Sequence, residues 1–437
     1  MLCVRMTTAL LTDRYELSML SSVVESGMAR QRAVFEVFAR RLPHGRRFGL
    51  LAGTGRFLEA LADFTVDADT LAWLVDHDVV TSAGAAYLDG WTFRGDIIGY
   101  REGDLYWPGS PVLTVRCDLA DGFLLETLAL SIFNHDTAVA SAAARMVLAA
   151  GGRPIIEMGS RRVDPDAAVA GARAAYLAGF SHTSNLQAGR RYGVPTTGTA
   201  AHAFTLAHRS EVEAFERQIA CHGVGTTLLV DTYDIGEGIR NAVKAANAAG
   251  ACGPGAIRID SGDLLVEARK ARDLLDSLGA AGTRIVTTSD LDEYTMTELA
   301  AAPVDGYGVG SRVATGSGHP SAGFVYKLVA IAHSAIPGTA LSPVEKRAVG
   351  KGSAGGEKTA YRSADGQEHY TVTGDIPDGA QPLQVTYVSA GEPVTRAWPT
   401  LAGARALAAD SLAGLDAHSR AVADGQPNRA CTRKDQP

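Results

Sequence analysis

Three aspartates follow three short apolar segments at nearly equal spacing along the chain. Asp231 follows TLLV, Asp260 follows AIRI, and Asp290 comes shortly after TRIVT. Asp231 and Asp260 are 29 positions apart, and Asp260 and Asp290 are 30 positions apart. In a β/α barrel the functional site lies at the carboxyl ends of the strands, so carboxylates repeated there are candidate catalytic groups. Each aspartate could instead cap the helix that follows it, but three at one edge favour a site.

A histidine and two arginines follow other predicted strands in the same way. His202 lies in GTAAHAF, a few residues beyond VPTT, where an imidazole could act as a base, a ligand or a phosphoryl acceptor. Arg161 and Arg162 follow PIIEM, and their planar guanidinium groups suit a carboxylate or a phosphate. Taken singly, the histidine could also be packed or face solvent, and the arginines could be ordinary surface residues.

A glycine-rich segment, GYGVGSRVATGSG, runs from residue 306 to residue 318. Gly308 and Gly310 would let backbone N–H groups approach a phosphate, and Ser311 adds a hydroxyl donor. The segment has neither the Walker spacing nor the dinucleotide-binding spacing of glycines. A lone glycine-rich loop is a weak signal, but its place after a late strand of the predicted barrel, where such enzymes often hold phosphate, strengthens the indication of phosphate binding to the point where both interpretations stay open.

These residue types together suit a phosphorylated substrate, a bound divalent cation and a small anionic co-substrate. A different barrel chemistry, a Schiff-base aldolase, would rest on Lys327 in GFVYKLV. The alternation of that segment places Lys327 on the face opposite Phe324 and Tyr326, and an ionic or structural role is favoured over an imine.

Strands alternate with helices from about Pro154 onward, which predicts parallel strands joined by right-handed crossovers. The expected strands of this region are 155–156, 194–197, 227–230, 256–259, 283–287 and 304–309. The expected helices between them are 166–178, 211–220, 235–249, 263–278 and 291–300. The sequence therefore predicts a barrel over roughly 150–330, between two flanking segments that pack together as a second domain.

The flanking segments mix both kinds of element. Before the barrel we expect helices over 13–27, 57–64, 69–77 and 123–150, and strands over 33–38 and 112–117. After it we expect short strands over 371–373 and 383–388 in an antiparallel element. Residues 350–358 are predicted to be a mobile loop, and residues 425–437 a frayed tail.

Composition narrows the class of protein. The chain has 437 residues, of which 46% are hydrophobic, and a formal net charge of −7. The apolar content excludes global disorder, and the acidic balance argues against a nucleic-acid partner. The five cysteines show neither a disulfide framework nor a zinc spacing. Because we find neither a signal peptide nor a long apolar run, we expect a cytoplasmic protein without a membrane segment.

A set of motifs resembles those of the nicotinate phosphoribosyltransferase family. The motifs are LTDRYELSM, FEVFARRLP, EMGSRR, GFSHTSN, GTAAHAF, LVDTYD, IRIDSGD, TSDLDE and GYGVGSR, and they span Leu11 to about Lys327. The resemblance implies an α/β fold: an irregular α/β barrel of the type II phosphoribosyltransferases, with a second α+β domain built from N- and C-terminal segments. The corresponding domains would be residues 1–125, 126–330 and 331–437, the last packing partly with the first. The resemblance also implies a homodimer with shared active sites.

The reaction implied by the resemblance makes nicotinate mononucleotide and pyrophosphate from nicotinate and phosphoribosyl pyrophosphate. ATP hydrolysis drives it, Mg²⁺ accompanies the phosphates, and the reaction is a salvage entry to NAD. No residue is assigned as a metal ligand of its own.

Site residues carry over by motif from the family. His202 is similar to the histidine that ATP phosphorylates, with Asp231 and Asp260 as the further catalytic residues. The substrate-binding positions implied are Tyr15, Arg41, Arg161, Thr183, Ser184, Arg258, Asp290, Gly310 and Ser311. Tyr15 would reach the neighbouring subunit's site and stack on the pyridine, and Arg41 would contact phosphate from the partner subunit. Gly310 and Ser311 would hold the 5′-phosphate.

Ser184 sits where nicotinamide-using relatives have an aspartate. An aspartate would accept from the amide NH₂ and repel a carboxylate, whereas serine can donate to a carboxylate. Met158 departs from the family, because relatives often have an aromatic residue there. The rival functions are a quinolinate or nicotinamide phosphoribosyltransferase and a catalytically silent, nucleotide-binding barrel.

Overall fold

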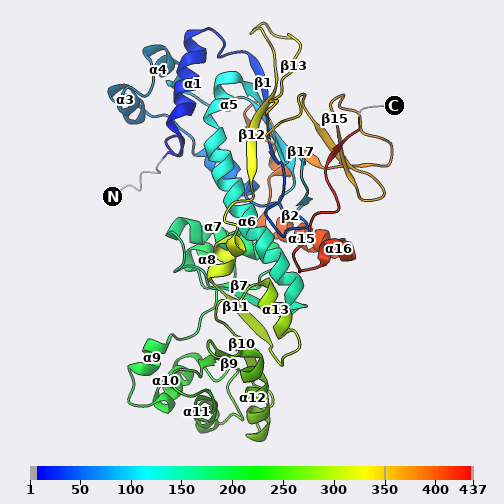
Figure 1. Ribbon diagram of the computed structural model, residues 1–437. Coiled ribbons are helices and arrows are strands. Elements are labelled where there is room, and N and C mark those ends of the chain that lie inside the picture. The colour runs from blue at the N-terminus through cyan, green and yellow to red at the C-terminus, as the bar shows by residue number, and fades with distance from the viewer. Residues whose placement is uncertain (1–6, 349–350, 435–437) are drawn as a thin grey trace. The chain divides into compact units, whose positions relative to one another are not determined.

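The computed structural model describes residues 7–348 and 351–434, and the chain forms two compact units (Figure 1). The terminal unit comprises residues 1–138 and 321–437, and the central unit comprises residues 139–320. The expected domain boundaries at 125/126 and 330/331 lie 13 and 10 residues from these divisions.

A curled parallel sheet forms the centre of the central unit. Its six strands pair in the order β7-β6-β11-β10-β9-β8, and each pair is parallel. Their bounds are β6 (Ile155–Glu157), β7 (His182–Thr183), β8 (Thr227–Leu229), β9 (Ala256–Ile259), β10 (Arg284–Thr287) and β11 (Gly306–Val309). Because β7 and β8 are the two edges, the sheet is an open half-barrel. The expected strand over 194–197 is reduced to one bridge, between Thr183 and Thr196.

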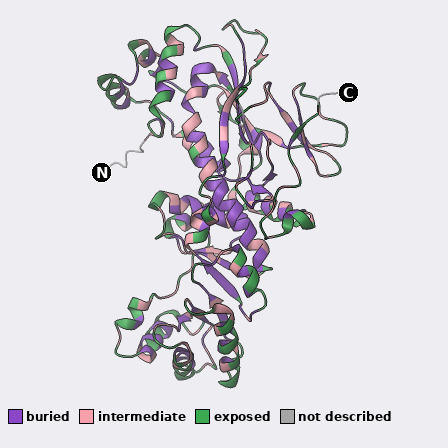
Figure 2. Ribbon diagram, viewed as in Figure 1, coloured by how far each residue is buried: buried purple, intermediate pink, exposed green. Residues whose placement is uncertain are grey.

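Helices follow the strands as the alternation predicts. They are α7 (Pro165–Ala178), α8 (Leu186–Tyr192), α9 (His202–Leu206), α10 (Glu211–His222), α11 (Ile235–Ala248), α12 (Leu264–Ser277), α13 (Glu293–Leu299), α14 (Ser311–Ala314) and the 3₁₀ turn η1 (Gly316–Gly318). The helix α6 (Glu126–Ala150) enters the unit at Val139, and its residues 139–146 are all buried (Figure 2). Half of these residues are alanines, whose small side chains let the helix pack closely against its neighbours.

The terminal unit is built on a seven-stranded antiparallel sheet in the order β13-β12-β1-β5-β3-β17-β18. The bounds of its strands are β1 (Arg32–Ala39), β3 (Asp96–Tyr100), β5 (Leu113–Asp118), β12 (Phe324–Ile331), β13 (Ser342–Pro343), β17 (Gln384–Ser389) and β18 (Glu392–Pro393). The central strand β1 therefore pairs with β5 from the N-terminal segment and with β12 from the C-terminal segment. Both flanks of the chain build this unit, as the sequence predicts.

Smaller elements complete the terminal unit. Its helices are α1 (Arg14–Glu25), α2 (Thr54–Ala62), α3 (Ala68–Asp76), α4 (Ser82–Leu88), α5 (Leu119–Leu124), α15 (Leu401–Ala413), α16 (Ala417–Arg420) and the turn η2 (Thr395–Ala397). A four-stranded sheet contains β14 (Thr359–Arg362), β15 (Glu368–Thr371), β16 (Gln381–Pro382) and β19 (Thr432–Arg433), and a further pair contains β2 (Gly49–Leu50) and β4 (Leu105–Tyr106). No helix among residues 7–348 and 351–434 has the length and apolar character needed to span a bilayer.

The segment expected to be a mobile loop is anchored at its end. Lys358 is buried, and its Nζ lies 2.5 Å from Oε2 of Glu36, whose side chain is 0% exposed. The Arg40 side chain donates to the backbone carbonyls of Gly352 and Lys351. Residues 351–358 form no helix or strand, as expected of a loop, and their mobility stays a prediction, while Gly350 lies outside the described residues. The ion pair of Lys358 with Glu36 ties the end of this loop to β1.

Candidate active site

A cavity of about 430 Å³ lies where the strands of the central unit end. Its lining comprises Met158, Ser160, Arg161, Arg162, Ser184, Gly198, Thr199, Ala200, Ala201, Arg258, Asp260, Thr288, Ser289, Asp290, Gly308, Gly310 and Ser311. Seven of the twelve catalytic and substrate-binding positions implied by the family resemblance are in this lining: Arg161, Ser184, Arg258, Asp260, Asp290, Gly310 and Ser311. The loops after β6, β7, β9, β10 and β11 thus converge at the carboxyl ends of the parallel strands, which is where α/β folds bind ligands.

The helix caps are made by aspartates other than the three that the spacing singled out. Asp234, Asp263 and Asp292 accept backbone N–H groups at the starts of α11, α12 and α13. Capping therefore does not explain the carboxylates that end the strands. Each of the same three loops carries a second aspartate, at position 231, 260 or 290. These three side chains do not cap the helices and can take part in a binding or catalytic site.

Asp231 organises the neighbouring loop rather than lining the cavity. Its Oδ2 accepts the backbone N–H of Asp260 at 2.9 Å and the hydroxyl of Ser261 at 2.7 Å. Its side chain is 1% exposed, and Oδ1 has no hydrogen-bond partner within the described residues. A buried carboxylate in this position holds the Asp260 loop in place and leaves one oxygen unused.

His202, the first residue of α9, faces that unused oxygen. The distance from His202 Nε2 to Asp231 Oδ1 is 3.9 Å, and His202 Nδ1 lies 3.2 Å from the hydroxyl oxygen of Thr232. The imidazole is 42% exposed, so a reactant in solution can reach it. A carboxylate at this distance can orient the imidazole ring.

Two guanidinium groups reach the cavity from different strands. Arg258 on β9 donates to the Thr199 hydroxyl, and its Nε is buried without a partner among the described residues. Burial lowers the pKa of Arg258, and the nearby carboxylates of Asp260 and Asp231 oppose that effect. An arginine remains cationic under such a shift, so Arg258 and Arg161 both bring positive charge to the cavity lining.

The backbone after β10 adopts conformations that are rare for residues other than glycine. The φ angles of Ser289 and Asp290 are 93° and 32°. Both residues line the cavity, and the preceding Thr288 donates its hydroxyl to Asp260 Oδ1 at 2.5 Å. Strain of this kind persists only where surrounding contacts impose it, and it concentrates at functional sites.

The two glycines of the segment after β11 have different reasons to be glycine. A Cβ at Gly308 would lie 2.6 Å from Thr288 Cγ2 and 2.8 Å from Met158 Sδ, so packing between strands requires glycine there. A Cβ at Gly310 would lie 3.2 Å from the Met158 carbonyl oxygen, a tight contact at the edge of the cavity. Gly310 is the better candidate for close approach of a ligand to the backbone.

Three of the predicted residues of the central unit do not line the cavity: Thr183, His202 and Asp231. The buried Thr183 hydroxyl donates to Glu157, a carboxylate that also accepts the backbone N–H of Gly159. Burial raises the pKa of Glu157, and these two hydrogen bonds oppose that effect. Glu157 thus links the loop after β6, which carries Arg161, to the loop that carries Ser184.

Tyr15 and Arg41 belong to the terminal unit. Tyr15 is 46% exposed at the start of α1, next to the N-cap Asp13. Arg41 is exposed just after β1, and no hydrogen bond or ion pair joins its side chain to a described residue. The adjacent Arg40 is held by two backbone carbonyls, so Arg41 is the freer of the two.

Several residues of the site escaped the sequence reasoning. Ser160, Thr199, Thr288 and Ser289 line the cavity, and Glu157 lies beneath it. All five lie within motifs quoted above: EMGSRR, GTAAHAF and TSDLDE. Position after a strand could have identified the hydroxyl residues, since parallel strands end at one edge.

Magnesium would have to be held largely by the substrate. Within the described residues no group of three His, Cys, Asp or Glu side chains could hold a metal ion. Mg²⁺ normally keeps several waters and takes only one or two carboxylates together with substrate phosphates. The unpartnered Oδ1 of Asp231 and the carboxylate of Asp260 fit that requirement.

A second cavity of about 430 Å³ lies within the terminal unit. Its charged lining consists of Arg30, Arg32, Arg94, Arg116, Asp89, Asp96, Asp118 and Asp121. Four guanidinium and four carboxylate groups balance one another, and none of the predicted site residues lines this cavity.

Comparisons with known proteins agree with the geometry. The family model described as nicotinate phosphoribosyltransferase (NAPRTase) N-terminal domain matches residues 10–134. A nicotinate phosphoribosyltransferase of Mycobacterium tuberculosis, pncB1, is 53% identical, over 96% of this chain and 93% of the relative. The human nicotinate phosphoribosyltransferase is 30% identical, over 94% of this chain and 92% of the relative.

Solved structures match the fold over nearly the whole chain. The crystal structure of human nicotinic acid phosphoribosyltransferase has a TM-score of 0.79 at 25% identity, covering 97% of this chain and 98% of that chain. A nicotinate-nucleotide pyrophosphorylase from Pyrococcus furiosus has a TM-score of 0.76 at 22% identity, covering 94% and 96%. The fold is therefore that of the type II phosphoribosyltransferases. Within that class, the chain belongs to the nicotinate phosphoribosyltransferase family.

Proposed function

We propose that this protein joins nicotinate to phosphoribosyl pyrophosphate, giving nicotinate mononucleotide and pyrophosphate, with ATP hydrolysis coupled to the reaction. Membership of the family supports the substrates. The observation that carries the proposal is the cavity in which Arg161, Arg258, Asp260, Asp290 and Ser311 meet. Such a lining offers cations to phosphates, carboxylates to sugar hydroxyls and a hydroxyl donor to a terminal phosphate.

The binding roles follow from the chemistry of the lining. Arg258 has an unpartnered buried Nε, which suits a phosphate or pyrophosphate oxygen. Asp290 is exposed in the cavity on a strained backbone, which suits the ribose hydroxyls. Ser184 donates to the nicotinate carboxylate beside Arg161, and Thr183 acts indirectly, by fixing the Ser184 loop through Glu157.

The chemical step is displacement at the anomeric carbon. The pyridine nitrogen forms the new bond as the bond to the pyrophosphate oxygen breaks, and positive charge develops on the sugar. The carboxylates near the ring stabilise that charge, and the arginines keep the leaving pyrophosphate in place. Magnesium, when bound with the substrate, would neutralise charge on the leaving group.

ATP coupling is assigned to His202. An imidazole nitrogen attacks the γ-phosphorus of ATP, the bond to ADP breaks, and water later hydrolyses the phosphohistidine to inorganic phosphate. The net change is ATP and water to ADP and phosphate. Phosphorylation adds negative charge and acceptor oxygens at the start of α9, beside Asp231, and so changes how cations gather at the site.

We further propose a homodimer that works in the cytoplasm. Tyr15 and Arg41 are exposed and not engaged in the core, and a second copy of the chain would place them at its site. A measurement of mass in solution tests the homodimer. Mixing Tyr15→Ala chains with His202→Ala chains tests whether the two copies share their sites. Recovery of ATP-stimulated activity on mixing supports shared sites. A mixed dimer that stays as slow as the two single variants argues against them.

The proposed reaction is tested by product formation from phosphoribosyl pyrophosphate with nicotinate, nicotinamide or quinolinate. We expect nicotinate mononucleotide with nicotinate and little product with the other two. Turnover of quinolinate alone would replace the proposal with the rival activity.

Ser184→Asp is expected to shift preference toward nicotinamide. The new carboxylate repels the carboxylate of nicotinate and accepts a hydrogen bond from the amide of nicotinamide. The ratio of kcat/KM for nicotinate to kcat/KM for nicotinamide should therefore fall by about 10²-fold, because one charge-assisted contact becomes repulsive. Ser160→Asp places the same charge on the same cavity and is the matched control. An equal shift in both variants, or none in Ser184→Asp, would reject the assignment.

A further inference from the structure

We propose that Arg145, Glu293 and Ser317 form a positioning network that fixes two loops of the cavity together. The inference rests on the proposed function, because it assumes that the cavity binds phosphoribosyl pyrophosphate. None of the three residues lines the cavity, so each acts through the loops and touches no substrate.

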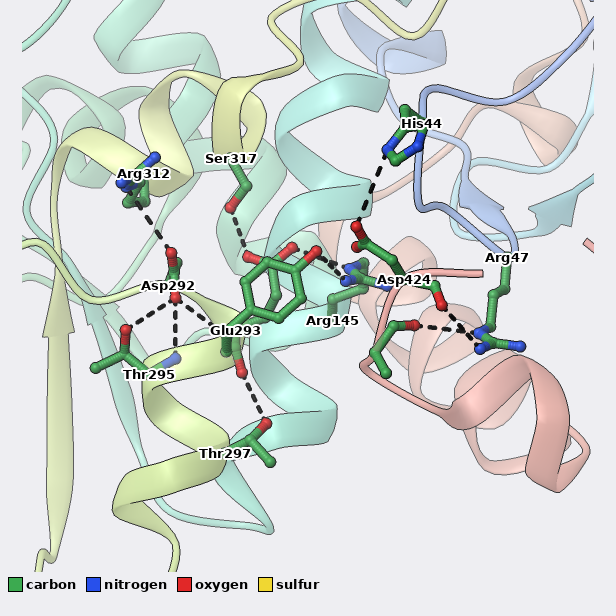
Figure 3. A network of polar contacts seen from close by, with 12 residues as sticks. His44, Arg47, Arg145, Asp292, Glu293, Thr295, Thr297, Arg312, Ser317 and Asp424 are labelled. Carbon is green, nitrogen blue, oxygen red and sulfur yellow. Dashed lines mark hydrogen bonds and ion pairs between the residues drawn. The ribbon is translucent and has the colours of Figure 1, made fainter. Parts of the chain in front are cut away.

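The network is centred on one buried carboxylate. Arg145 on α6 and Glu293 on α13 are 2% and 1% exposed, and Arg145 Nε donates to Glu293 Oε1 at 2.9 Å. The second oxygen, Oε2, accepts the Ser317 hydroxyl of η1 at 2.6 Å (Figure 3). The carboxylate therefore contacts both α6, through Arg145, and η1, through Ser317, so a change in one contact can alter the other.

The elements joined in this way are those that carry the two loops. Glu293 is the first residue of α13 and follows Asp290, the strained end of the loop after β10. Ser317 lies beyond Ser311, and its own φ angle is 52°. Left-handed backbone at Ser317 needs contacts that impose it, and the Glu293 carboxylate supplies one. The same carboxylate, through Arg145, holds the start of α13, which lies three residues after the strained Asp290.

A weaker contact joins α13 to α14, which carries Ser311 at its start. Arg312 Nε on α14 lies 3.9 Å from Oδ2 of Asp292, the residue that caps α13 (Figure 3). Arg145 is fixed further by Tyr294, whose hydroxyl accepts from it at 3.1 Å and whose ring lies 5.5 Å from its guanidinium carbon. Helix α6 thus acts as the fixed support from which both loops are held.

Ser317→Ala tests the inference with little risk to folding, because it removes one hydroxyl and keeps Arg145 paired with Glu293. We expect KM for phosphoribosyl pyrophosphate to rise about 3- to 10-fold, with kcat changed less than twofold, since loosened loops weaken ground- and transition-state binding alike. The matched control is Thr297→Ala, which removes a hydroxyl of α13 that donates to the Glu293 backbone carbonyl rather than to its carboxylate. Equal KM values for the two variants would overturn the inference.

A double variant shows whether Ser317 acts through Glu293. If it does, the double variant Glu293→Gln with Ser317→Ala has the same KM as Glu293→Gln alone. A double variant whose fold-change in KM equals the product of the two single fold-changes would contradict a shared network. Thermal unfolding checks that the variants fold, and if Glu293→Gln does not, the comparison of Ser317→Ala with Thr297→Ala decides alone. Asp290→Asn separates this inference from the proposed function. If KM for phosphoribosyl pyrophosphate rises in Asp290→Asn but not in Ser317→Ala, the positioning network is overturned and the proposed function stands. If KM is unchanged in Asp290→Asn, both the network and the proposed function are overturned.

Discussion

The His202→Ala variant is expected to form no acid-labile phosphoenzyme and to lose the gain in rate that ATP provides. The imidazole is the phosphoryl acceptor in the proposed coupling, and Asp231 lies 3.9 Å from its Nε2. We expect kcat/KM measured with ATP to fall by about 10²-fold, the size typical of losing a group that acts through charge near the transition state. Acid-quenched labelling with γ-³²P-ATP and initial rates with and without ATP measure both effects.

His208→Ala is the matched control for this prediction. His208 lies on the same stretch of chain, two residues beyond α9, and its Nδ1 lies 2.7 Å from the Phe204 carbonyl oxygen. It should keep both the phosphoenzyme and the ATP stimulation. A labelled His202→Ala protein, or loss of label in His208→Ala, would show that the acceptor is assigned to the wrong residue.

The Lys358→Met variant is expected to lose about 3–5 kcal/mol of unfolding free energy at neutral pH, because it leaves the buried Glu36 carboxylate without its counter-charge. Adding Glu36→Gln should recover part of that loss, since the charge then disappears. Urea unfolding of the single and double variants measures the difference. Lys270→Met, which breaks an exposed pair with Glu267, should have no measurable effect.

The loss in Lys358→Met should depend on pH in a defined direction. Burial raises the pKa of Glu36 to about 7, and Lys358 is the strongest influence lowering it. A folded-state pKa above the unfolded value means that the stability Glu36 contributes is full below the unfolded pKa and is lost as pH rises through about 7. Without Lys358 the pKa of Glu36 rises further. The loss of unfolding free energy in Lys358→Met should therefore be smaller at pH 5 than at pH 8, and an equal loss at the two pH values would contradict this account.

The alternation of strands and helices in the central unit could be predicted because each element has its own local pattern. Strands such as 256–259 and helices such as 263–278 lie within one or two residues of β9 and α12. The partner of a strand is not a local property, however. The segment after Phe324 has a strand pattern that suits either sheet, and only the structure shows that it pairs with β1 in the antiparallel sheet.

Lys327 illustrates the same point for function. It lies on that antiparallel strand, 3.7 Å from the Glu126 carboxylate, so the ionic role favoured from the sequence is confirmed. The half-barrel's open edge and the single bridge at Thr196 also depend on long-range pairing, which spacing along the chain does not specify.

Site residues at the ends of strands were accessible to sequence reasoning, and their buried supports were not. Asp260 and Arg258 end an apolar segment, a position that points to the edge of the sheet. Arg145 and Glu293 are single charges in helical segments, which normally indicate a solvated face. Their burial results from the packing of α6 against α13, and that packing is tertiary.

One time course tests the central claim most directly. Nicotinate mononucleotide, pyrophosphate and ADP are measured together after nicotinate, phosphoribosyl pyrophosphate, ATP and magnesium are mixed with the purified protein. We expect nicotinate mononucleotide and pyrophosphate in equal amounts, with ADP formed alongside them and slower product formation when ATP is omitted. The absence of nicotinate mononucleotide, or its formation at the same rate without ATP and without ADP, would contradict the account.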